Sequence, residues 1–141
     1  MLTVHDGNTL TMRIDGHIEK VRLIGMEAPE LTQTPWGRQA RDMLKALAED
    51  KSVRLETDNT LRDQYKHLLA YVYVGEKLVN LEMLRQGQAV IHTVPPNVAH
   101  LEEYRKAQAE ASGAGRGLWD PAQPLDAMPD CYRKVKKGEE C

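Results

Sequence analysis

The order of apolar patterns along the chain predicts an α+β fold, in which a small antiparallel sheet carries helices on its flank. Alternating apolar residues on both sides of Asp15-Gly16 indicate a hairpin with a two-residue turn. The segment from Leu68 to Val74 is almost continuously apolar, which is typical of a central strand. Most of the helical pattern follows the first strands. Periodicity alone does not distinguish a closed barrel from an open sheet.

The first half of the chain predicts a hairpin followed by a helix. Residues 10–14 alternate between apolar and polar, and residues 18–24 form the partner strand. Thr34 followed by Pro35 has the residue types of a helix N-cap and a first helical position. Apolar residues three to four apart after this pair predict a helix that runs to about Glu49.

The second half predicts shorter strands and two more helices, with Asn80 and Asn97 as their N-caps. In chain order, we expect a strand over 53–55, a strand over 68–74, a strand over 77–79, a helix from 80 to just before 87, a strand over 90–93 and a helix from 97 to about 112. We expect residues 1–120 to form one domain, and residues 121–141 to form a loosely attached tail with both cysteines.

Composition bounds the function. The 141 residues are 41% hydrophobic, which is enough for one core although phenylalanine is absent. A net charge of -2 gives no general attraction to a polyanion, so any contact with nucleic acid must come from a local basic patch. No apolar run approaches the length of a membrane span, and we expect a monomer without a membrane partner.

Both ends of the sequence leave alternatives open. Met1 to His5 form only a short lead, so either the first strand is short or the natural chain begins earlier. In the second case, removal of a signal peptide would mean export to the periplasm or the medium. Cys131 and Cys141 are either bridged around the basic residues 133–137 or two separate thiols, and an oxidising compartment favours the bridge.

Three polar corners flank the expected strands. Arg22, Glu27 and Glu30 lie where a strand ends at a proline, Asp6 to Thr9 lie one strand pair earlier, and Asp63 to His67 precede the central strand. A charged turn that only terminates a strand is the simpler interpretation of each corner taken alone. Their occurrence together makes them a candidate site.

The order and spacing of these corners resemble the staphylococcal nuclease (thermonuclease) family. The matching motifs are Asp6-Gly7-Asn8-Thr9, Arg22-Leu23 through Ala28-Pro29-Glu30, Asp63 through Leu69-Ala70-Tyr71-Val72-Tyr73, Val79-Asn80 through Arg85-Gln86-Gly87, and Gly117-Leu118-Trp119. The resemblance implies a five-stranded OB-type barrel with three helices. It also implies a calcium ion that polarises a phosphodiester, a glutamate that activates water, and two arginines that neutralise the developing charge.

This chain keeps some of the family's functional residues and has other residue types at the remaining positions. Arg22 stands at the first arginine and Glu30 at the general base. Asn8 replaces a calcium-binding aspartate and keeps only a neutral oxygen. Glu27 replaces the second aspartate, and its extra methylene displaces the carboxylate by about 1.5 Å. Ala28 replaces a threonine that offers its backbone carbonyl to the metal, so this contact need not change.

The third corner is changed as well. His67 stands at the second arginine, but an imidazole with a reference pKa of about 6.5 is mostly neutral at pH 7 and has no planar fork. Lys66 could reach the same phosphate as a point charge. Tyr65 is the one stacking ring that remains near this corner, because the other tyrosines of the family fall near His92 and Thr93.

These changes predict a nuclease-like domain whose calcium affinity is weak or absent and whose phosphodiesterase activity is lost or very weak. Residual binding of single-stranded nucleic acid is the expected function. Two alternatives remain: a divergent nuclease that uses Asn8, Glu27 and Glu30 for another metal with His67 as an acid, and a protein-interaction module whose basic tail attaches it to a partner. The sequence leaves the localisation unknown.

Overall fold

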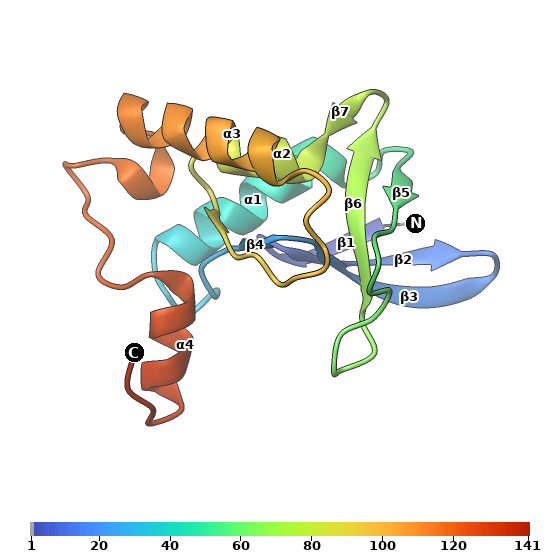
Figure 1. Cartoon of the computed structure of the whole chain (residues 1–141), viewed down its shortest axis with the longest axis horizontal. Helices are drawn as coiled ribbons and strands as arrows, with labels where there is room; N and C mark the ends of the chain where they lie inside the picture. The colour runs from blue at the N-terminus through green and yellow to red at the C-terminus, as the bar shows by residue number, and fades with distance from the viewer. Residues whose placement is uncertain (1) are drawn as a thin grey trace.

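The computed structural model describes residues 2–141 as an α+β fold (Figure 1). Met1, the first residue of the predicted lead, lies outside the described residues. The elements in chain order are β1 (Leu2–Asp6), β2 (Thr9–Ile14), β3 (His17–Leu23), β4 (Met26–Glu27), α1 (Trp36–Ala48), β5 (Arg54–Glu56), β6 (Leu68–Val74), β7 (Lys77–Leu78), α2 (Val79–Arg85), β8 (Val90–Ile91), α3 (Leu101–Ala114), the 3-10 helix η1 (Gly117–Trp119) and α4 (Pro129–Lys136).

The main sheet has the order β1-β2-β3-β6-β5, with β7 also paired to β6. All of these pairs are antiparallel except β3 with β6, which is parallel. The hairpin at Asp15-Gly16 is confirmed, and both turn residues have positive φ angles of 50° and 82°. The central position of β6 is confirmed too. No pairing among residues 2–141 joins β1 to β5, so the closed barrel stays a prediction.

Helices α1, α2 and α3 cover the sheet and enclose the core (Figure 1). The buried face of α1 repeats every fourth residue, because Trp36, Ala40, Leu44 and Ala48 all point inward. This helix therefore follows the prediction closely. The predicted cap is wrong: Pro35 occupies the N-cap position, and no side chain there bonds to the helix. The packing of its apolar face outweighs the missing cap.

The two asparagines predicted as caps have other roles. Asn80 is completely buried inside α2, where its Oδ1 accepts a hydrogen bond from Val72 N at 2.9 Å. Asn97 exchanges two hydrogen bonds with the backbone of Thr60, at 2.8 and 2.9 Å, and α3 begins four residues later, at Leu101. Both side chains connect distant segments, because a buried amide can satisfy backbone groups that no strand partner reaches.

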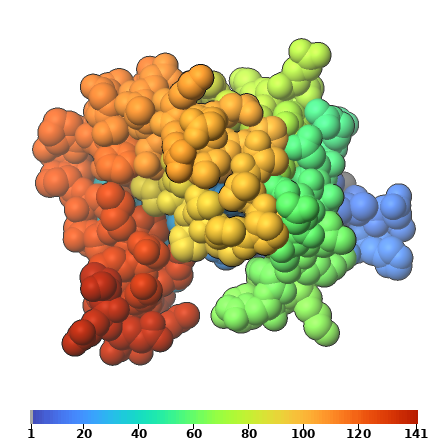
Figure 2. Space-filling model, viewed as in Figure 1, coloured from blue at the N-terminus to red at the C-terminus, as the bar shows by residue number. Residues whose placement is uncertain are grey.

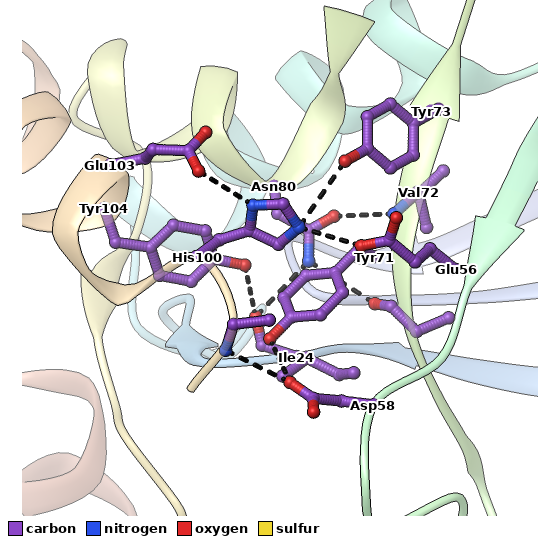
Figure 3. Close-up of polar contacts among 12 residues, drawn as sticks. Ile24, Glu56, Asp58, Tyr71, Val72, Tyr73, Asn80, His100, Glu103 and Tyr104 are labelled. Carbon is purple, nitrogen blue, oxygen red and sulfur yellow. Dashed lines mark hydrogen bonds and ion pairs between the residues drawn. The ribbon is translucent and has the colours of Figure 1, made fainter. Parts of the chain in front are cut away.

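A polar network lies where the start of α3 meets β5 and β6 (Figure 3). His100 lies between Glu56 and Glu103, at 2.8 and 3.0 Å. Below it, the Tyr71 hydroxyl donates to Asp58 Oδ2 at 2.7 Å. The network also includes Asn80 and Tyr104, whose hydroxyl donates to the backbone oxygen of Ile24 at 2.6 Å.

The tail folds as helix α4 and lies against the loop between β4 and α1, away from the other helices in Figure 1. The Gln33 side chain donates to Asp126 Oδ1 at 3.0 Å and to the backbone oxygen of residue 127 at 2.7 Å. The Tyr132 hydroxyl donates to Thr32 Oγ1 at 3.0 Å. Cys131 of α4 forms a disulfide with Cys141, which is the first of the two alternatives that the sequence left open. The boundary of the domain at residue 120 stays a prediction.

None of the helices in the described part of the chain combines the length and apolar character that a membrane crossing requires.

Candidate functional site

The centre of the candidate site is an ion pair between Arg22 and Glu27. Arg22 lies on β3 in register with Thr9 of β2 and Leu69 of β6, so two neighbouring strands fix its backbone. Glu27 lies on β4, which pairs with β8. The Arg22 Nη2 group donates to Glu27 Oε1. Only 5% of the Glu27 side chain is exposed, against 30% of Arg22, so the guanidinium keeps one side open to solvent.

Asn8 lies in the turn between β1 and β2, where its backbone oxygen accepts a hydrogen bond from Leu23 N at 2.9 Å, and Gly7 lets this turn pack against Ala28. A Cβ on Gly7 would lie 2.5 Å from Ala28 Cβ and 2.7 Å from Ala40 Cβ, so only glycine fits there. The Asn8 side chain is buried, and its Nδ2 has no hydrogen-bond partner in the part of the chain that the structure describes. Buried donors without a partner are rare in proteins, so this amide is an unusual feature of the turn.

Glu30 lies in the loop between β4 and α1. Gly37 brings this loop against the helix, because a Cβ there would lie 1.8 Å from the Glu30 backbone oxygen. The Glu30 side chain is 28% exposed, and its Oε2 accepts a hydrogen bond from Lys136 Nζ at 3.1 Å. A partly exposed carboxylate on a fixed loop keeps contact with water, as a general base requires.

Helix α4 supplies two cations that the sequence did not place here. Arg133 lies against Glu27 Oε2, so this carboxylate is between two guanidinium groups, and Lys136 pairs with Glu30 one turn later. Burial and the nearby charge of Arg22 lower the pKa of Arg133 from its ordinary value, although a carboxylate on β1 opposes this effect. The basic run 133–137 was the only signal in the sequence, because these residues are more than a hundred positions from their partners.

The corner at residues 63–67 is organised around Asp63. Its Oδ1 accepts from the backbone N–H groups of Tyr65 and His67, both at 2.9 Å, and its Oδ2 lies 3.1 Å from His67 Nδ1. The Tyr65 ring is 64% exposed, and Lys66 is exposed with a positive φ of 66°. His67 therefore pairs with a carboxylate of its own turn. The structure brings Arg22, Asn8, Glu27, Ala28 and Glu30 together, and it places Tyr65, Lys66 and His67 on a neighbouring corner.

A pocket of about 390 Å³ lies between these two groups. Arg22 and Glu27 stand on its wall together with Arg62, Asp63 and Asn97, and most of its exposed lining is apolar. The apolar lining comes from Leu23, Ile24, Met26, Leu69 and Val94. A concave apolar surface with a guanidinium at one side suits a flat ring that carries an anionic group.

The calcium ion implied by the resemblance does not fit this arrangement. Calcium takes six to eight oxygen ligands, but both oxygens of Glu27 face guanidinium groups, and Asn8 contributes no charge. Within residues 2–141, no group of three or more His, Cys, Asp or Glu side chains is arranged to hold a metal. The predicted roles of Arg22, Glu30 and His67 in catalysis stay predictions.

Arg22 and Glu27 on the wall of an apolar pocket, with Glu30 on the loop that follows, are the residues that the nuclease motifs contribute to this site. Residues 20–121 match the family described as "Staphylococcal nuclease homologue". The chain is 34% identical over 122 residues to a thermonuclease of Staphylococcus intermedius, with 83% of this chain and 73% of that protein aligned. It is also 34% identical over 138 residues to an uncharacterized endonuclease of Haemophilus influenzae, covering 97% of this chain and 73% of that protein.

A third relative is endonuclease YncB of Bacillus subtilis. It is 31% identical to this chain over 121 residues, and the alignment covers 57% of its length. The chain thus belongs to the staphylococcal nuclease family, as its motifs predicted.

Proposed function

We propose that this chain binds single-stranded nucleic acid through its phosphate groups, and that its calcium-dependent phosphodiesterase activity is lost or very weak. The observation that carries this proposal is the pocket, which has Arg22 and Glu27 on its wall and apolar side chains over most of its surface. A nucleotide offers a phosphate for the guanidinium and a base for the apolar surface. The exposed ring of Tyr65 adds a surface on which a second base stacks.

Weak catalysis is supported by the positions of three side chains. Glu27 is neutralised by two arginines, Asn8 carries no charge, and His67 pairs with Asp63 instead of a substrate phosphate. The loss of one transition-state arginine elsewhere costs about a thousandfold or more in rate. The closed OB-type barrel remains part of this proposal, since ligands of such barrels bind on one face near the strand ends.

A divergent metal-dependent nuclease is the second candidate. It is favoured by Glu30, whose carboxylate is partly exposed at the position of the family's general base. It is also favoured by the relatives named as endonucleases. In this case Glu30 takes a proton from water, and Arg22 holds the phosphate.

Cleavage and binding of one labelled single-stranded DNA separate the two candidates. The purified protein is titrated with calcium, manganese and magnesium beside a Glu30→Gln variant. We expect no cutting above this variant, and binding that weakens linearly with the logarithm of salt concentration. Metal-dependent cutting that disappears in Glu30→Gln would instead establish a nuclease. If the protein neither cuts the DNA nor binds it in a salt-dependent way, the protein-interaction module is the remaining function.

We also infer that the protein works in an oxidising compartment, outside the cytoplasm. The bridge between Cys131 and Cys141 supports this localisation, because disulfides persist in such compartments. Thiol labelling of the protein isolated from its native source tests it. Two unreactive cysteines are expected, and two labelled thiols would contradict the inference.

A further inference from the structure

We propose that helix α4 completes the phosphate site: Arg133 and Arg22 bind one phosphodiester group together, without a divalent metal ion. This inference rests on the proposed function and identifies the second guanidinium that the 63–67 corner does not supply. It gives the C-terminal tail a direct role in ligand binding.

The guanidinium groups of Arg22 and Arg133 lie close together, because both contact the carboxylate of Glu27. Arg22 contacts Oε1 and Arg133 contacts Oε2 of this carboxylate. An arginine carries five N–H donors, and Glu27 is the one acceptor that either arginine contacts within residues 2–141. The remaining donors therefore suit the paired oxygens of a phosphodiester. Both side chains are partly exposed, by 30% and 25%, so a ligand can reach them.

The charges of the site point to the same role. Asp6, Glu27 and Glu30 carry three negative charges and Arg22 carries one positive charge, so without α4 these four residues have a net charge of -2. A site with this charge would repel the ligand unless a cation bound first. Arg133 and Lys136 add two positive charges, the same number that one calcium ion would bring. Substitution of the metal by α4 therefore explains why the site no longer fits calcium.

The buried amide of Asn8 fits an anion as well. Its Nδ2 group donates to no atom of residues 2–141, whereas a calcium ion would require an oxygen ligand. A donor that turns toward a phosphate oxygen would satisfy this buried group. The change from the family's aspartate to Asn8 and the arrival of Arg133 thus point to the same ligand, because both favour an anion over a metal cation.

The tail is held firmly enough to act as part of the site. Its contacts with Gln33 and Thr32 fix α4 on the loop that carries Glu30, and the disulfide closes its end. Figure 2 shows a recess in the surface between the red tail and the green segment around residues 60–67. A single strand lying in this recess would have its phosphate beside α4 and its base toward the pocket.

Fluorescence anisotropy of a short labelled oligothymidylate tests the proposal in EDTA and then in calcium at constant ionic strength. We expect equal binding in both conditions. Arg133→Gln and Arg22→Gln should each weaken binding about tenfold or more, because a hydrogen bond to a charged group is lost. Each should also reduce the slope of affinity against salt by about one unit. Lys134→Gln is the matched control, since it removes the same charge from an exposed position of α4.

Tyr132→Phe tests whether packing of α4 on the loop affects nucleic-acid binding. It removes the hydrogen bond between α4 and Thr32 without changing the charge of the helix. We expect less than a twofold change in affinity. Binding by the wild type that Arg22→Gln weakens and Arg133→Gln leaves unchanged would overturn this inference and keep the proposed function. Tighter binding in Arg133→Gln would show that α4 blocks the site, and binding only with calcium would overturn the substitution of the metal. No binding by the wild type in either condition would overturn both proposals.

Discussion

Two polar clusters of this protein differ in whether their polar groups find partners inside the chain. In the network of Figure 3, His100 has a carboxylate at each ring nitrogen and Asn80 binds three backbone groups. In the cluster around Glu27, the Asn8 amide has no partner within the described residues, and two arginines share one carboxylate. A satisfied network stabilises the fold, whereas a buried polar group without a partner lowers stability unless a bound molecule supplies one.

The largest expected effect is a difference in stability between variants of the two buried asparagines, Asn80 and Asn8. Asn80→Ala should lower the free energy of unfolding by about 2–4 kcal/mol, because it leaves the buried Val72 N without its acceptor and removes the two bonds that the amide donates to backbone carbonyls. Asn8→Ala should lower it by less than about 1 kcal/mol, since the amide donates no bond. Urea unfolding of both variants measures this difference. Equal losses would show that the Asn8 amide is as well satisfied as that of Asn80.

Tyr104 tests the network at a single hydrogen bond. Its hydroxyl is buried and donates to the Ile24 backbone oxygen, and burial raises its pKa well above the ordinary value. Tyr104→Phe should cost about 1–2 kcal/mol of stability. The control is Tyr132→Phe, whose hydroxyl is near the surface and should contribute less than about 0.5 kcal/mol. Similar losses in the two variants would contradict the distinction between the regions.

His100 makes the network sensitive to pH. Burial lowers its pKa, but the hydrogen bonds to Glu56 and Glu103 outweigh this effect, so the net shift is upward from 6.5. The folded state therefore binds the proton more tightly than the unfolded state. This contribution is fully present below pH 6.5 and is lost as the pH rises through the folded-state pKa.

Unfolding of the wild type and of His100→Gln at several pH values checks this effect. The advantage of the wild type should shrink as the pH rises above 6.5, by an amount that one hydrogen-bonded charge explains, about 1 kcal/mol. An advantage that grows with pH would contradict the sign. His92→Gln, on an exposed side chain, is the control for the substitution itself.

The pair between Lys136 and Glu30 should contribute least to stability. The lysine is 54% exposed, and such pairs contribute about 0–1 kcal/mol. Lys136→Gln should therefore change the free energy of unfolding by less than about 1 kcal/mol, and by less still in high salt. A larger loss that salt does not reduce would mean that α4 belongs to the cooperative core. This outcome would remove part of the contrast between the two regions.

The local pattern of apolar and polar residues was sufficient to predict most of the helices and strands. The turn at Asp15-Gly16 and the apolar run of β6 were predicted at their observed positions, because chain direction and strand period depend on neighbouring residues. Predictions at helix ends were poorer. Asn80 has the residue type of a cap, but its position in the core gives it partners on β6 and at Ile24, directly after β3, instead.

The amino-acid sequence was sufficient to predict the family, the hairpin and the central strand, because these follow from motifs and from strands that are adjacent in the chain. That Arg22, Glu27 and Glu30 belong to one site was implied by the resemblance to the family. The position of the tail became clear only in the folded chain. No local rule relates Arg133 to Glu27, since their contact depends on how a distant helix packs against a loop. Long-range ion pairs and unpartnered buried groups are properties of the folded chain, and the candidate site depends on both.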